Sequence, residues 1–231
     1  MTDKTKQLTN LDPRILEFQN QLRAQYKQAN QVAQTDQILL IGSSTMEIFP
    51  IEKWQATRNL GLQHQIYNRG VRATTTADLL AHMQTLVFDL QPRAVFINIG
   101  SNDIGFNVPE ADFLRNYTEV LRQIHAQLPQ TKVYVMAYFP INATDDFGEE
   151  PAEHGKLYEH RSNERLLKAN EQVAQLAAQH GDQFINVNTG LTDDQGNLRA
   201  ALTFDGAHML PAGYEIVLNN LMPYLKQVDE G

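Results

Sequence analysis

The chain has 231 residues, of which 42% are hydrophobic and 20% charged, and this composition fits one globular domain. Nineteen Lys and Arg residues stand against 27 Asp and Glu residues. The resulting formal net charge of −8 disfavours nucleic acid and strongly anionic membrane surfaces as partners. The sequence contains no cysteine, which excludes disulfides, thiolate zinc sites, iron–sulfur clusters and cysteine nucleophiles.

No apolar run reaches the roughly 20 residues needed to span a bilayer, so we expect no integral membrane segment. The first six residues, Met1 to Lys6, are polar and lack the apolar core of a signal peptide. We therefore expect a cytoplasmic protein whose chemistry depends on oxygen and imidazole groups.

The first predicted element is an amphipathic helix at about 12–34, where Ile15, Phe18, Leu22 and Tyr26 recur at spacings of three and four. A short apolar run with β-branched residues follows at 38–42 and predicts a buried strand. Similar runs predict strands at 65–68, 94–99, 133–138 and 184–187. Helical patterns lie between or after these strands, at 76–90, 109–128, 161–180 and 211–226.

Strands that alternate with helices predict an α/β fold with a parallel sheet covered on both faces. No internal repeat or low-complexity linker divides the chain, so we expect a single domain over 1–231 with an N-terminal helical extension at about 10–35. The one long irregular stretch, 142–158, is acidic. Its length and polarity favour a loop over a site rather than a second domain.

In an open α/β sheet, ligands bind beyond the carboxyl ends of the strands. The residues that follow three of the predicted strands, or precede the last helix, therefore form the candidate site. They are Gly42-Ser43-Ser44-Thr45, Asn68-Arg69-Gly70, Gly100-Ser101-Asn102-Asp103 and Asp205-Gly206-Ala207-His208.

These segments supply the groups that acyl transfer needs. A serine hydroxyl becomes a good nucleophile when a histidine accepts its proton, and a carboxylate then holds the histidine in the correct tautomer. The tetrahedral intermediate needs hydrogen-bond donors for its oxyanion, which backbone N–H groups and an asparagine amide can provide.

The four segments, in this order and over about 38–214, resemble the SGNH/GDSL hydrolase family. The resemblance implies a flavodoxin-like three-layer α/β fold with about five strands and a serine esterase or acylhydrolase activity. It implies that Ser44 is the nucleophile, His208 the base and Asp205 the residue that orients it. The implied oxyanion donors are the N–H groups of Ser44 and Gly70 and the side-chain amide of Asn102. It implies no metal and no organic cofactor.

Two positions depart from the family pattern. Ser43 replaces the usual aspartate and Thr45 the usual leucine. Neither carries chemistry in the mechanism that the family implies, but Ser43 becomes an alternative nucleophile beside Ser44.

Each segment also has a purely structural interpretation. Ser44-Thr45 and Asn102-Asp103 could cap the helices that directly follow them. Gly70 could be a turn residue with positive φ, and His208 a structural histidine. Because the four segments occur together, we favour the catalytic interpretation.

Other candidates carry weaker signals. His154 and His160 could bind a metal, but their spacing of six suits no helical ligand pair, so we expect a solvated acidic loop. The isolated histidines His64, His82, His125 and His180 show no patterned carboxylate partner. Several aromatic residues near strand ends fit core packing better than an acyl pocket: Phe49, Trp54, Phe106, Tyr138 and Phe139.

We expect a serine esterase for short-chain carboxylic esters, with a small-molecule ester as its partner. The alternatives are a carbohydrate O-deacetylase, or an enzyme similar to lysophospholipases and platelet-activating-factor acetylhydrolases. A non-catalytic interaction module is a further alternative. The pattern leaves the oligomeric state and the natural alcohol open.

Overall fold

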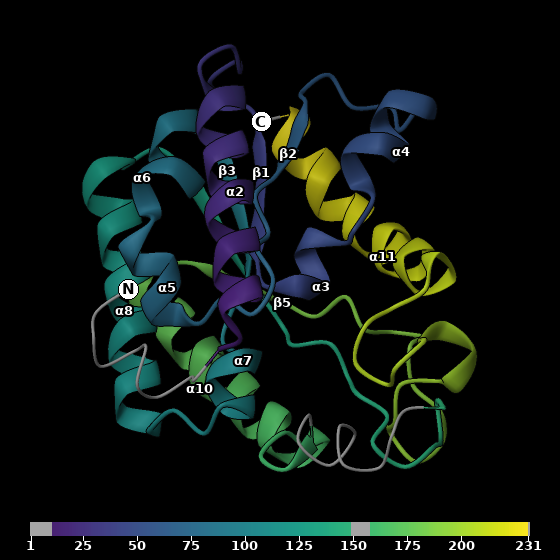
Figure 1. Cartoon of the computed structure of the whole chain (residues 1–231). Coiled ribbons are helices and arrows are strands. Elements are labelled where there is room, and N and C mark those ends of the chain that lie inside the picture. Colours follow the sequence, from purple (N-terminus) through teal and green to yellow (C-terminus); the bar gives the residue numbers. More distant parts are fainter. Residues whose placement is uncertain (1–10, 149–157, 231) are drawn as a thin grey trace.

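The computed structural model describes residues 11–148 and 158–230 (Figure 1). Five strands form one parallel sheet in the order β2-β1-β3-β4-β5, which is the flavodoxin-like order. They are β1 (Ile38–Gly42), β2 (Ile66–Asn68), β3 (Ala94–Asn98), β4 (Lys132–Met136) and β5 (Gln183–Ile185). The predicted α/β fold with five strands is therefore confirmed; β1 has the predicted bounds, and the ends of the other strands differ by at most two residues.

Helices cover both faces of the sheet, and every residue of β1 and β3 is buried. The helices are α2 (Pro13–Asn30), α3 (Ser44–Glu47), α4 (Ile51–Thr57), α5 (Thr76–Ala81), α6 (Met83–Leu86), α7 (Ser101–Gly105), α8 (Glu110–Gln127), α10 (Asn163–His180) and α11 (Pro211–Glu230). Two 3-10 turns, η1 (Phe88–Leu90) and η2 (Ala200–Leu202), complete the elements of the described chain.

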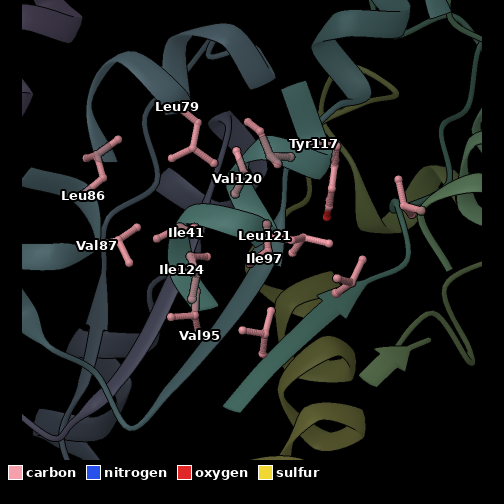
Figure 2. Close-up of a cluster of buried hydrophobic side chains, with 14 of the residues drawn as sticks. Ile41, Leu79, Leu86, Val87, Val95, Ile97, Tyr117, Val120, Leu121 and Ile124 are labelled. Carbon is pink, nitrogen blue, oxygen red and sulfur yellow. The ribbon is translucent and has the colours of Figure 1, made fainter. Parts of the chain in front are cut away.

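Alternate residues of each strand enter different cores, because successive side chains point to opposite faces. Leu39 and Ile41 of β1 pack in one core with side chains of α5, α6, α8 and α10, and Figure 2 shows part of this cluster. Ile38 and Leu40 pack in the other core with side chains of α3, α4 and α11. The two cores fix the position of the sheet, and the loops that follow the strand ends are thereby fixed relative to one another.

The predicted helix at 76–90 is wrong as a single element. The structure divides it into α5, α6 and η1, with a break at His82 (φ −130°, ψ 17°). The apolar residues on both sides of the break face the same core, so the helical periodicity continues across it. Three short helices, α3, α4 and α7, lacked any prediction because four to seven residues carry too little periodicity.

The N-terminal helix α2 is docked onto the domain. Tyr26 donates from its hydroxyl to Gly70 O at 2.8 Å, and the Asn30 amide donates to Thr85 O at 2.7 Å. Leu22 and Tyr26 pack against the same core as α6 and α8. Within the described ranges, no helix has the length and apolar character needed to cross a membrane.

Asp229 connects the end of α11 to the segment before β2 through hydrogen bonds. Its carboxylate accepts hydrogen bonds from the Gln63 N–H (2.9 Å), the His64 N–H (2.8 Å) and His64 Nδ1 (2.8 Å). Burial by itself raises the pKa of Asp229, but these hydrogen bonds outweigh it and hold the pKa below the usual value.

We predict that Asp229→Ala lowers the free energy of unfolding by about 1–3 kcal/mol at pH 7, because two backbone N–H groups lose their acceptor. The carboxylate has a lowered pKa in the folded state, so its contribution is present above about pH 4 and is lost as the pH falls through the folded pKa. Urea unfolding from pH 3 to 7 should show the gap to wild type closing in acid. The exposed neighbour Glu230→Ala is the control and should match wild type. A gap that is constant with pH would contradict this assignment.

Candidate active site

Ser44 is the first residue of α3, directly beyond the carboxyl end of β1. Gly42 ends the strand, where a Cβ would overlap Asn98 O of β3, so the close approach of the two strands requires glycine. Ser44 Oγ lies 2.7 Å from His208 Nε2. A predicted nucleophile and a predicted base, 164 residues apart, are thus in hydrogen-bond contact.

His208 and Asp205 lie in a tight turn before α11. Asp205 Oδ1 accepts from the N–H groups of Ala207 (2.9 Å) and His208 (2.7 Å), and Oδ2 lies 2.6 Å from His208 Nδ1. Gly206 has φ +82°, a backbone conformation that is strained for residues with a side chain. A Cβ at this position would also overlap Asn142 O. The turn holds the carboxylate and the imidazole in one fixed geometry.

The contact with Asp205 determines which ring nitrogen carries the proton. A carboxylate accepts at Nδ1, so Nδ1 carries the hydrogen and Nε2 is left to accept from the Ser44 hydroxyl. Burial raises the pKa of Asp205, but the hydrogen bonds from the His208 side chain and backbone outweigh this and keep the pKa below its usual value. Asp205 is therefore ionised near neutral pH.

Asn102 stands on α7, which follows β3, and its side chain is 6% exposed. Its Oδ1 accepts from Arg161 Nη2 at 2.8 Å, and its Nδ2 donates to Thr74 O at 3.0 Å. An amide nitrogen carries two hydrogens, so one remains for another acceptor. Asn102 lines the same small pocket as Ser44 and His208.

Gly70 does not join this group. Its N–H donates to Asn68 Oδ1 at 2.9 Å, which leaves no hydrogen for an oxyanion. A Cβ at Gly70 would overlap the Glu47 backbone nitrogen of α3, and its φ is not positive. Glycine is required here for close packing, so neither the predicted oxyanion role nor the alternative of a positive-φ turn fits the geometry.

The turn that follows Gly70 offers another backbone amide. Ala73 has φ +55°, uncommon for a residue with a side chain, and directly precedes Thr74, which accepts from Asn102. Among the described residues, no acceptor is bonded to the Ala73 N–H. The sequence does not point to Ala73, because an alanine gives no signal of a left-handed backbone.

The helix-cap interpretations fail in the structure. Ser43, not Ser44, is the N-cap of α3, and its side chain makes no capping bond. Gly100 is the N-cap of α7. Asp103 instead accepts from the N–H (3.0 Å) and Oγ1 (2.6 Å) of Thr76 at the start of α5, and burial raises the pKa of Asp103 to about 7. The alternative nucleophile Ser43 is buried, with 1% exposure, and is absent from the pocket lining.

The histidines outside the site have mixed surroundings. His154 lies outside the described residues, and His160 Nε2 lies 3.7 Å from Glu159 Oε1. In the described ranges no three His, Asp or Glu side chains are grouped to hold a metal ion. His64 and His125 each lie 2.8 Å from a carboxylate that is distant in the sequence, Asp229 and Asp182 respectively, so no local pattern could show these partners.

The pocket around Ser44 is narrow and partly apolar. Phe139, Ile141 and Leu166 supply its apolar wall, and Arg161 joins Asn102 on the polar side. The free volume is about 20 Å³, close to the space that one water molecule occupies. Phe204 is 52% exposed and stacks on the His208 ring, with centroids 5.8 Å apart. The sequence pattern pointed to neither Arg161 nor Phe204, and for Phe139 it favoured core packing over an acyl pocket, whereas Phe139 lines the pocket.

Known structures share this fold. A protein from Streptococcus pneumoniae that is described as a platelet activating factor is 28% identical, with a TM-score of 0.80, over 97% of this chain and 100% of that chain. A GDSL-like lipase from Bacteroides thetaiotaomicron is 20% identical (TM-score 0.71; 89% and 97%). An acetyl xylan esterase from Geobacillus stearothermophilus is 20% identical (TM-score 0.59; 84% and 96%). No functionally curated protein matches the sequence.

The sequence over residues 40–216 matches the GDSL-like lipase/acylhydrolase family, which covers most of the chain. This range contains all four segments at the strand ends and the whole sheet except the first two residues of β1, Ile38 and Leu39. The family and the fold agree with the resemblance found from the sequence segments. The chain therefore belongs to the GDSL-like lipase/acylhydrolase family and is a carboxylic ester hydrolase.

Proposed function

We propose that the protein is a serine esterase in which Ser44, His208 and Asp205 form the catalytic triad. The observation that carries the proposal is the pair of contacts at His208: 2.7 Å from Nε2 to Ser44 Oγ and 2.6 Å from Nδ1 to Asp205 Oδ2. These contacts match the roles of nucleophile, base and orienting carboxylate.

In the first half-reaction, Ser44 Oγ attacks the ester carbonyl carbon while its proton passes to His208 Nε2. The tetrahedral intermediate collapses, the bond to the alcohol oxygen breaks, and His208 returns the proton to the departing alkoxide. In the second, a water oxygen attacks the acyl-enzyme and gives its proton to His208. The bond to Ser44 Oγ then breaks, the acid leaves and Ser44 recovers its proton.

The oxyanion of both intermediates needs donors that are not already bonded. We propose the Ser44 N–H, the second hydrogen of Asn102 Nδ2 and the Ala73 N–H. The free hydrogen of Asn102 and the absence of a bonded acceptor for Ala73 N–H among the described residues support this set. Gly70 is left out because its N–H already binds Asn68.

Two measurements on the purified protein test this function. We expect hydrolysis of p-nitrophenyl acetate, and inactivation by a fluorophosphonate that bonds covalently to an activated serine. A protein that neither hydrolyses the ester nor reacts with the fluorophosphonate would contradict the proposal and favour an interaction module.

We predict a preference for short acyl groups, from acetyl to about butyryl or hexanoyl. A pocket with about 20 Å³ of free space holds little more than a methyl group beside the reacting carbon. Where a pocket admits a long chain, each buried methylene adds about 0.8 kcal/mol and the rate climbs with chain length. A p-nitrophenyl series from acetate to palmitate measures this. A maximum of kcat/KM at dodecanoyl or longer would contradict the prediction.

An acetyl ester of a carbohydrate is the second candidate substrate, because the same small pocket suits an acetyl group. The fold shared with an acetyl xylan esterase is consistent with it. Release of acetate from acetylated xylan, compared with release from platelet activating factor, distinguishes a sugar alcohol from a lipid alcohol.

A further inference from the structure

Arg161 is a buried cation in the wall of the catalytic pocket. It precedes Ser162, the N-cap of α10, and is 9% exposed. It lines the pocket together with Ser44, Asn102 and His208. The mechanism proposed above gives it no task.

The guanidinium has one hydrogen-bond partner in the described part of the chain. Arg161 Nη2 donates to Asn102 Oδ1 at 2.8 Å, and no carboxylate oxygen of the described residues lies within 4.0 Å of its nitrogens. Its Nε is buried without a partner. Burial lowers the pKa of Arg161. Burying a charge beside an amide rather than a carboxylate lowers the stability of the fold. An arginine at this position therefore indicates a role other than stabilising the fold.

The contact fixes the orientation of the Asn102 amide. If the amide were flipped, its NH₂ group would face the guanidinium, and two donors would oppose each other. The charge also polarises the amide through Oδ1, which makes the Nδ2 hydrogens stronger donors. One of these hydrogens is bonded to Thr74 O. The amide is therefore held in a fixed orientation, and its second hydrogen is a stronger donor for an oxyanion.

The segment that carries Arg161 also touches the other half of the site. The Tyr158 hydroxyl donates to Asp205 O at 2.6 Å, and the Arg161 N–H donates to Tyr158 O at 3.2 Å. The backbone of Arg161 therefore belongs to a turn that is hydrogen-bonded to Asp205 through Tyr158. This anchoring limits the movement of Arg161 relative to Ser44.

We propose that Arg161 is a positioning residue for the oxyanion hole, and that it acts through Asn102 by orienting and polarising the amide. The proposal rests on the proposed function, because it assumes that Asn102 donates to the oxyanion. Arg161 itself makes no contact with the substrate in this account.

A double-mutant cycle on p-nitrophenyl acetate hydrolysis tests the proposal. We expect Asn102→Ala to lower kcat by about 10²- to 10³-fold and Arg161→Gln by about 10- to 100-fold, each with a small change in KM. The double variant should be no slower than Asn102→Ala within about twofold, because a residue that acts through the amide has no effect once the amide is gone. The exposed Arg165→Gln on α10 is the matched control and should keep the wild-type kcat.

A second variant moves the guanidinium without removing its charge. A Cβ at Gly105, the last residue of α7, would lie 2.5 Å from Arg161 Nη2, and the φ of Gly105 is not positive. Gly105→Ala should therefore displace the guanidinium and lower kcat in the wild-type background, with no further loss in the Arg161→Gln background. This variant also carries the test if Arg161→Gln fails to fold, which Tm would reveal.

Three outcomes would overturn the proposal. The first is a double variant whose loss equals the product of the two single losses, and the second is a Gly105→Ala variant with wild-type kcat. The third is an Arg161→Gln variant whose KM rises only for esters with a carboxylate on the acyl group. That result would mean that Arg161 binds an anionic substrate directly. If Asn102→Ala instead kept full activity, Asn102 would not be an oxyanion donor and the role of Arg161 would fail with it, whereas the triad of Ser44, His208 and Asp205 would be untouched by this result.

Discussion

Replacing Ser44 with alanine should lower kcat for p-nitrophenyl acetate by about 10⁴- to 10⁶-fold and leave the Tm close to that of wild type. The loss is large because the acyl-enzyme cannot form without Oγ. The fold should persist because the hydroxyl hydrogen-bonds to His208 alone among the described residues, and Ser44 is not part of either hydrophobic core. Initial rates under saturating ester, together with thermal unfolding, measure both quantities.

Ser43→Ala is the matched control for that variant. Ser43 is the neighbouring hydroxyl, but it is buried and lies outside the pocket lining. Its alanine variant should retain kcat within about tenfold of wild type, far from the loss expected for a triad residue. An inactive Ser43→Ala with an active Ser44→Ala would place the nucleophile one residue earlier.

Asp205→Asn should lower kcat by about 10⁴-fold with little change in stability. The asparagine oxygen can still accept from the N–H groups of Ala207 and His208, so the turn is kept. Its NH₂ group, however, donates to His208 Nδ1, which moves the ring proton to Nε2. Nε2 then cannot accept the proton of Ser44.

Asp193→Asn provides the control for Asp205→Asn. Asp193 Oδ1 also accepts two backbone N–H groups, those of Gln195 and Asn197, but it is exposed and outside the pocket. We expect wild-type kcat for this variant. Equal activity of Asp205→Asn and wild type would remove the carboxylate from the mechanism.

The strands and the grouping of Ser44, His208 and Asp205 could be predicted because their signals are local in the sequence. Each strand is a short apolar run, and Asp205 and His208 share one turn three residues apart. The alternation of strands and helices then brings the strand ends to one edge of the sheet. These local signals, together with the family resemblance, are enough to predict the residues of the proposed triad.

The remaining parts of the site depend on contacts that no local pattern reports. Arg161 reaches Asn102 across 59 positions, and an arginine beside an acidic loop resembles a solvated residue in the sequence. The N–H of Gly70 is already bonded because Asn68, two residues earlier, turns its side chain back. The positive φ of Ala73 follows from the path of the chain between β2 and α5. Hydrophobic periodicity likewise could not show the break at His82, since the core is continuous across it.

The most direct test of Ser44 as the nucleophile is to map the site of fluorophosphonate labelling by mass spectrometry. Trypsin cleaves after Lys27 and Lys53, so Ser43 and Ser44 share one peptide and fragment ions must separate them, whereas Ser101 lies in another peptide. We predict one added phosphonyl group on Ser44, and none on the Ser44→Ala variant. A label on Ser43 or Ser101, or ester hydrolysis that continues in protein fully labelled on Ser44, would contradict the account.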